Sequence, residues 1–242
     1  MSEASIPTTA TEARAIAPAT GKLGVLTPGV GAVASTFIAG VLAARKNGVD
    51  PIGSISQMAH IRLGSRAENR NPKIKEFVPI ASLDDLVFGG WDPISANALE
   101  AARTAGVLEE RDLAPISAEL EGVVAMPAAF QNRWVSKLEG TRVKESTDLR
   151  ALVNEIETDI QRFKEENGCD RLVMVWCGST EAYQEPSAVH DTIESFEAGL
   201  DALAPLAARI GPTVEEVARP IGGVPDKSLE RISGDMDASA IK

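Results

Sequence analysis

A glycine-rich break between a strand and a helix constrains this chain more than any other feature. Residues 23–27, Leu-Gly-Val-Leu-Thr, are typical of a buried strand, and residues 29–34 read Gly-Val-Gly-Ala-Val-Ala before a helical run. Gly29 permits a tight turn, Gly31 has no Cβ to block a phosphate, and Ala34 is small enough for close helix-on-strand packing. The break therefore predicts a dinucleotide pyrophosphate held by the unpaired amides of the first helical turn. Tight packing with no ligand remains the alternative.

Length and composition place the chain among globular proteins. With 242 residues, of which 44% are hydrophobic, it can bury one sizeable core or one domain with part of a second. No run reaches the roughly 18 consecutive apolar residues of a membrane helix, and no signal pattern opens the chain. We therefore expect a cytoplasmic protein with no membrane partner.

Charge and cysteine content argue against nucleic-acid binders and against domains held together by disulfides or zinc. The net charge of -11 argues against a nucleic-acid partner, because general nucleic-acid binders are usually basic. Cys169 and Cys177 are too few for a disulfide framework and have the wrong spacing for a zinc pair. We expect a reducing compartment and no metal site.

Strand-like and helical runs alternate along the chain, which predicts an α/β fold with a Rossmann-like, doubly wound and mainly parallel sheet. The clearest helix covers residues 148–166, where Thr147 or Asp148 can cap an apolar face and Gly168 suits the exit. The other expected elements are strands at residues 23–27, 86–89 and 171–176, helices at residues 33–46 and 94–105, and a short apolar segment around residues 52–55.

Three regions are expected along the chain. Residues 1–20 lack an apolar period and predict a flexible arm, and residues 21–200 predict the cofactor-binding domain. Residues 201–242 predict a divergent, poorly ordered tail. Within the domain, residues 64–75 combine basic side chains with Gly and Pro, which indicates an exposed basic loop.

Two further strand ends carry glycine and polar residues. Residues 87–92, Val-Phe-Gly-Gly-Trp-Asp, end on Asp92, which we expect to accept hydrogen bonds from a ribose or an amine. Residues 173–181 run from an apolar strand into a Gly-Ser-Thr turn. Each end alone is typical of an ordinary turn. Because ligands of open α/β sheets lie outside the carboxyl ends of the strands, the three ends together predict one cofactor crevice.

The acidic residue that dinucleotide sites usually carry about 20 residues after the glycines has no clear counterpart. Asp50 has this spacing, but it precedes the apolar segment at residues 52–55 instead of ending it, which is the wrong end for reaching a ribose. This departure argues against an ordinary dehydrogenase. No arginine directly follows that segment, so we expect NAD and not NADP.

Taken together, these motifs resemble those of the NAD-dependent myo-inositol-phosphate synthases. The resemblance runs from about Lys22 to Phe196, and its most specific parts are Gly-Trp-Asp at residues 90–92 and Ser-Thr-Glu at residues 179–181. It implies that bound NAD would contact three groups of residues. These are Gly29, Val30, Gly31, Ala32 and Val33 at the pyrophosphate, Asp92, Ala128 and Ala129 at the adenosine end, and Cys177, Gly178, Ser179 and Thr180 at the nicotinamide ribose.

The resemblance also implies an isomerase that uses oxidation internally. Glucose 6-phosphate would be oxidised by bound NAD, enolised, closed by an intramolecular aldol step and reduced again to inositol phosphate. It implies a small-molecule sugar phosphate as substrate, a homo-oligomer, and a role in inositol and phospholipid biosynthesis.

Beyond Phe196 the motifs of the family lapse, as expected for a truncated or frame-disrupted product or for a diverged relative. The lysines with which the family stabilises an enolate belong to a later catalytic domain, so no catalytic residue is assigned here. A non-catalytic NAD-binding remnant and an ordinary NAD-dependent oxidoreductase stay open as alternatives.

Overall fold

The computed structural model describes residues 20–46, 49–131, 135, 138–146, 148–179, 182–183 and 185–210, without the side chains of residues 203–210. Apart from Thr20, the arm expected at residues 1–20 lies outside this part of the chain, and so does the expected tail after residue 210.

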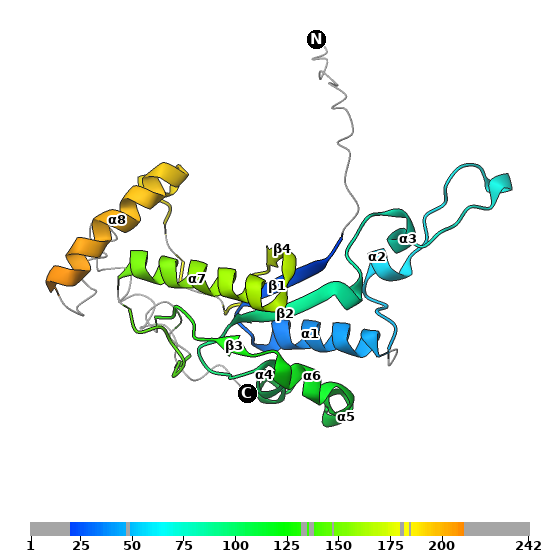
Figure 1. Cartoon of the computed structure of the whole chain (residues 1–242), viewed down its shortest axis with the longest axis horizontal. Coiled ribbons are helices and arrows are strands. Elements are labelled where there is room, and N and C mark those ends of the chain that lie inside the picture. Colours follow the sequence, from blue (N-terminus) through cyan, green and yellow to red (C-terminus); the bar gives the residue numbers. More distant parts are fainter. Residues whose placement is uncertain are drawn as a thin grey trace, which may run out of the picture.

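A four-stranded, fully parallel sheet forms the centre of the described part (Figure 1). The chain places two strands on one side of β1 and then crosses to its other side, which gives the spatial order β3-β2-β1-β4. The direction of winding therefore reverses between β1 and β4, and such switch points are where open α/β sheets bind ligands. The strands are β1 (Lys22–Pro28), β2 (Leu86–Trp91), β3 (Ala125–Met126) and β4 (Cys169–Met174).

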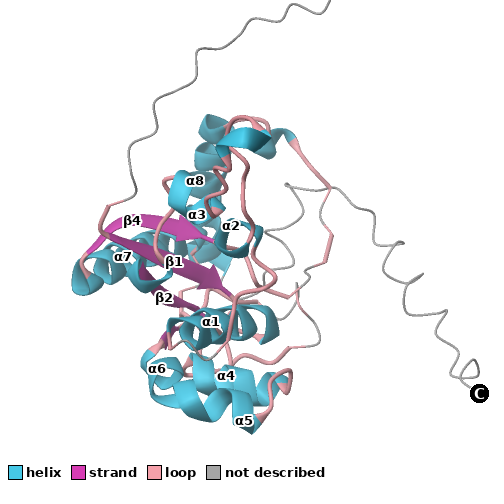
Figure 2. Cartoon of the chain, turned by 90° about the vertical axis from the view of Figure 1, so that its right-hand side faces the viewer, coloured by secondary structure: helices cyan, strands magenta, loops and turns pink. Residues whose placement is uncertain are grey.

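Helices cover both faces of the sheet, as Figures 1 and 2 show from two directions. Alternate residues of β1 point to opposite faces. Val25 joins a core cluster with Ile38 of α1, whereas Leu26 joins a second cluster with Phe163 of α7. The expected doubly wound, Rossmann-like fold is therefore confirmed. The helices on the first face are α1 (Ala32–Arg45), α4 (Ala98–Ala105), α5 (Glu110–Leu113) and α6 (Ser117–Gly122), and α7 (Leu149–Asn167) covers the second.

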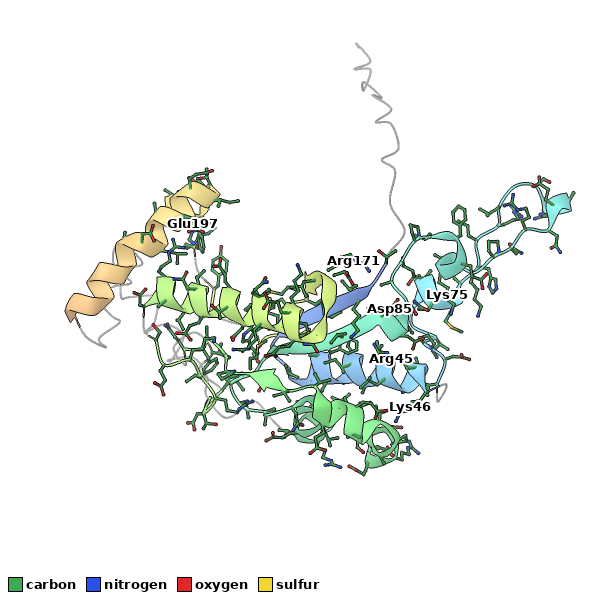
Figure 3. All side chains as sticks on the ribbon, viewed as in Figure 1. Arg45, Lys46, Lys75, Asp85, Arg171 and Glu197 are labelled. Atoms are coloured by element: carbon green, nitrogen blue, oxygen red, sulfur yellow. The ribbon has the colours of Figure 1, made fainter. Side chains whose placement is uncertain are left out.

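The long helix α7 has the ends that its sequence predicts. The Asp148 carboxylate accepts the backbone N–H groups of Arg150 and Ala151 at 2.9 and 3.3 Å. Gly168 ends the helix with a φ of 61°, in the left-handed region that favours glycine. Arg150 pairs with Glu197 at 2.6 Å and so docks α8 (Ile193–Ile210) on α7 (Figure 3). Helix α8 therefore includes residues 201–210 of the region expected to be a tail.

Helix α4 begins at Ala98 and not at residue 94 as expected. The Asp92 carboxylate accepts the backbone N–H groups of Ile94 and Ser95, which holds them in a turn before the helix. The Asn97 side chain then caps the helix by accepting the Glu100 N–H at 2.9 Å. A side-chain acceptor therefore moves the start of the helix along the chain.

Between α1 and β2 the chain leaves the domain as a narrow arm (Figure 1). Isolated antiparallel bridges join His60 to Lys73 and Leu63 to Arg70, so the first part of the basic loop expected at residues 64–75 forms the outer end of this arm, and its last two residues begin a short helix. The apolar segment at residues 52–55 forms a turn that leads into a short helix, not a strand. The short helices here are α2 (Ile55–Met58) and α3 (Ile74–Phe77).

The C-terminal end of α1 is fixed at the amino edge of the sheet. Arg45 donates to the Leu83 carbonyl at 2.8 Å and its guanidinium lies 5.5 Å from the centre of the Phe88 ring. Figure 3 shows Arg45 near Asp85, away from the N-terminus of α1. These contacts orient the helix so that its N-terminus faces the opposite, carboxyl edge. No helix within the described residues has both the length and the apolar character required to cross a membrane.

Candidate cofactor site

The turn after β1 requires glycine at its first position. Gly29 has a φ of 84°, which L residues with a side chain rarely adopt. A Cβ at this position would also lie 2.6 Å from the Gly178 Cα, so the turn passes directly against the segment that follows β4. The Gly29 N–H donates to the Trp91 carbonyl of β2 at 2.8 Å. The turn is therefore fixed between both neighbouring strands.

Gly31 differs from Gly29, because the fold itself does not require glycine there. It precedes α1 with an ordinary φ of -82°, and an added Cβ would meet no atom of the described residues within 4 Å. The first turn of α1 contains no acidic residue, and Ala32 and Val33 are exposed. Open space therefore lies in front of unpaired, partly positive amides, and these residues fit a dinucleotide pyrophosphate.

Asp92 follows β2 and connects two of the loops at the carboxyl edge. Its side chain is buried, with the residue 6% exposed. Oδ2 accepts the Val30 N–H at 3.0 Å, and Oδ1 accepts the Ile94 and Ser95 N–H groups at 2.8 and 2.6 Å. Each carboxylate oxygen has two lone pairs, so Oδ2 retains acceptor capacity for a ligand hydroxyl. The contacts support a role in shaping the loop, and direct contact with adenosine stays a prediction.

The segment after β4 continues beside β1. The Cys177 N–H donates to the Pro28 carbonyl at 2.9 Å, and Gly178 lies against Gly29. Burial raises the pKa of the Cys177 thiol, which is therefore protonated at neutral pH, in line with a packing role. Ser179 is exposed, and Thr180 lies outside the described residues.

The segment after β3 reaches the same edge. Ala128 is 8% exposed, and its main chain pairs with residues 142–144, accepting the Lys144 N–H at 2.9 Å. Ala129 is exposed. Because the four strands are parallel, the predicted residues that the structure describes gather at one edge of the sheet, with residues 128–129 on the β3 side and residues 177–179 on the β4 side.

Sequence analysis missed a buried polar cluster beneath this edge. The Trp91 indole N–H and the Lys144 ammonium both reach the Asp159 carboxylate of α7, at 2.9 and 2.8 Å. One signal was available, because residues 152, 156, 159 and 163 share a face of the helix and Asp159 is the acid among them. Trp91 lies 68 positions away and Lys144 lies in the loop before α7, so neither of these two partners gives a local signal.

Arg142 was also missed. It donates to the Ala125 carbonyl at 2.8 Å and to the Ser95 carbonyl, and so ties the loop after Asp92 to β3. Within the described part of the chain, no group of three or more His, Cys, Asp or Glu side chains could hold a metal ion.

The chain matches a family model described as myo-inositol-1-phosphate synthase over residues 23–213, which continues past Phe196. It is 47% identical over 184 residues to inositol-3-phosphate synthase 1 of Bacteroides thetaiotaomicron, covering 75% of this chain and 42% of that protein. It is 30% identical over 195 residues to inositol-3-phosphate synthase 1 of rice, covering 74% of this chain and 38% of the relative.

A crystal structure of inositol-3-phosphate synthase from Caenorhabditis elegans has the same fold, with a TM-score of 0.67 and 24% identity over 75% of this chain and 39% of that one. The chain thus spans less than half the length of these relatives. The part it contains includes the NAD-binding domain. On these grounds the chain belongs to the myo-inositol-1-phosphate synthase family.

Proposed function

We propose that this chain binds NAD at the carboxyl edge of its sheet and supplies the cofactor-binding half of an inositol-3-phosphate synthase. The observation that carries the proposal is the open space at Gly31, in front of the N-terminus of α1 and at the switch point of the sheet. A pyrophosphate needs both a Cβ-free approach and unpaired amides, and this position offers both. NAD in such an enzyme would accept a hydride from the sugar and return it, so that no net oxidation results.

The residues of this chain would bind and orient the dinucleotide. The turn at Gly29 and the Asp92 carboxylate fix the loop before the cofactor arrives, which lowers the ordering cost of binding. The proposed contacts are Gly29, Val30, Gly31, Ala32 and Val33 at the pyrophosphate, Asp92, Ala128 and Ala129 at the adenosine end, and Cys177, Gly178, Ser179 and Thr180 at the nicotinamide ribose.

The proposed substrate is glucose 6-phosphate, converted to inositol phosphate for inositol and phospholipid biosynthesis. Matched relatives are named inositol-3-phosphate synthase, which supports this choice. We further propose a cytoplasmic homo-oligomer. Cys169 and Cys177 are both free thiols, which is compatible with a reducing compartment.

For this polypeptide by itself we propose NAD binding without turnover. It covers 42% of its bacterial relative, which supports this proposal. The other alternative is an ordinary NAD-dependent oxidoreductase. With such an enzyme, NADH would accumulate when its substrate is added.

The test is a calorimetric titration of the purified chain with NAD and with NADP, followed by incubation with NAD and glucose 6-phosphate. We expect NAD to bind more tightly than NADP, with no steady formation of NADH. Tighter binding of NADP would refute the cofactor preference. Net NADH would support the oxidoreductase, and released inositol phosphate would show that this polypeptide is catalytically complete.

A further inference from the structure

A buried carboxylate on α7 lies directly behind the candidate cofactor site. Asp159 Oδ2 accepts the Trp91 Nε1–H at 2.9 Å and lies 2.8 Å from the Lys144 ammonium nitrogen. Its Oδ1 accepts a guanidinium N–H of Arg162 at 2.6 Å. Trp91 is 5% exposed, and the side chains of Lys144 and Asp159 are 8% and 7% exposed, so water screens these two contacts only weakly, whereas the Arg162 side chain is half exposed.

We propose that Asp159 is a positioning residue for the cofactor loop, acting through Trp91 and Lys144. The inference rests on the proposed NAD site and deepens it. Under this proposal the cluster of Asp159, Trp91 and Lys144 contributes to NAD binding. The alternative is that its ion pair contributes to stability alone.

Trp91 connects the carboxylate to the glycine loop. Its side chain is held by Asp159, and its carbonyl accepts the Gly29 N–H at 2.8 Å. The next residue, Asp92, accepts the Val30 N–H at 3.0 Å. The indole hydrogen bond therefore adds a side-chain anchor, besides the pairing of Trp91 with Met126 of β3, to the strand end from which both loop amides are held.

Lys144 connects the same carboxylate to the proposed adenine side. Its ammonium group pairs with Asp159, while its backbone N–H donates to the Ala128 carbonyl at 2.9 Å. Trp91 and Ala128 also belong to one buried apolar cluster. Asp159 therefore contacts two segments that would bind opposite parts of the adenosine diphosphate moiety, and Glu155, 3.5 Å from the Lys144 ammonium nitrogen, is a second carboxylate at the Lys144 end.

The charge state of Asp159 fits this role. Burial by itself raises the pKa of the carboxyl group, but hydrogen bonds from Lys144 and Trp91 and the charge of Arg162 outweigh it, so the pKa lies below its usual value. The group is ionised at neutral pH and accepts strong, charge-assisted hydrogen bonds. Such a pair adds little net stability, although removing one partner is costly.

Two variants test the inference, with a control on the same helix. Trp91→Phe removes the indole donor and keeps an aromatic ring, and Asp159→Asn keeps the shape and removes the charge. Glu157→Gln changes an exposed acid of α7 that lies outside the cluster. For each folded variant, the NAD dissociation constant is measured by calorimetry, and amide hydrogen exchange of Gly29 and Val30 is measured by NMR without NAD.

We expect both cluster variants to weaken NAD binding about tenfold, the scale of one hydrogen bond to a charged group, and to speed exchange of both loop amides. Exchange at Leu42, inside α1, should not change, and Glu157→Gln should match the parent chain in both measurements. The double variant should lose little more than the weaker-binding single variant, because both changes weaken the same contact between Trp91 and residue 159.

Unchanged NAD affinity and loop exchange in both variants, with only a lower melting temperature, would overturn the inference while leaving the proposed NAD site intact. If Asp159→Asn does not fold, the NAD affinity and loop exchange of Trp91→Phe are the deciding measurements. A parent chain that does not bind NAD, combined with faster loop exchange in Trp91→Phe, would refute the proposed site and support the positioning of the loop by Asp159.

Discussion

The Asp92 carboxylate accepts the Val30 backbone N–H at 3.0 Å, which joins the end of β2 to the glycine loop after β1. The other oxygen of the same group holds the turn at Ile94 and Ser95. The aspartate of the Gly-Gly-Trp-Asp segment is thus part of the loop's support before any ligand arrives, and this changes what its substitution should do.

Asp92→Asn should lower both apo stability and NAD affinity. A neutral amide has one acceptor oxygen, so its NH₂ group would face either the Val30 N–H or the turn donors and leave a buried donor unpaired. We expect the free energy of unfolding to fall by about 1–3 kcal/mol, the cost of an unsatisfied buried group. Urea unfolding and NAD titration of one variant measure both effects. Unchanged unfolding would contradict the supporting role, and unchanged NAD affinity would remove Asp92 from the site.

The local parts of this site could be predicted from the sequence, because the chain encodes them within a few residues. Gly29, Gly31 and the strand before them lie in one short run, and Asp148 and Gly168 mark the two ends of α7. These signals depend on turn and cap chemistry, which acts over neighbouring residues.

The long-range parts could not be predicted. Trp91 and Asp159 are 68 positions apart, and only the packing of α7 on the sheet brings them together. The sequence predicts different roles for the two loop glycines, but only the structure shows that Gly29 lies against Gly178 and that a Cβ at Gly31 would meet no atom of the described residues within 4 Å. Tertiary contacts decide both points.

Gly31→Ala should separate ligand binding from folding. Its φ suits alanine, and the added Cβ meets no atom in the part of the chain that the structure describes, so the free energy of unfolding should change by less than about 1 kcal/mol, the scale of a helix-cap substitution. NAD affinity should fall by about tenfold or more, because the methyl group occupies the approach of the pyrophosphate. Calorimetry measures the NAD affinity of this variant, and thermal melting measures its stability.

Gly40→Ala is the matched control for Gly31→Ala. Gly40 lies within α1, and among the described residues its added Cβ also meets no atom within 4 Å. We expect a gain of about 0.5–1 kcal/mol in stability from higher helix propensity, and unchanged NAD binding. Equal NAD affinity in Gly31→Ala and the parent chain would place the pyrophosphate elsewhere.

Stability should depend on the ionisation of Asp159 at acid pH. Folding lowers the pKa of this carboxyl group, so its contribution is complete above the unfolded value of about 3.9 and is lost as the pH falls through the lower folded value. The difference in unfolding free energy between the parent chain and Asp159→Asn should therefore shrink as the pH falls from about 5 to about 3. Urea unfolding at several pH values measures it, and a constant difference would show that ionisation of Asp159 does not contribute.

The contact of α7 with the sheet gives the last prediction. A Cβ at Gly89 would lie 2.5 Å from Cε2 of the Phe163 ring, which is 9% exposed and cannot easily move. Gly89→Ala should therefore lower the free energy of unfolding by about 1–3 kcal/mol, as overpacking of a core does. Phe163→Leu leaves a gap where the ring stood and should also destabilise the chain alone. In the double variant the new methyl group fills part of that gap. The double variant should therefore lose less unfolding free energy than the sum of the losses in the two single variants. Chemical denaturation of the parent chain, the two single variants and the double variant measures the four free energies of unfolding. Strictly additive losses would show that the ring does not limit the space at Gly89.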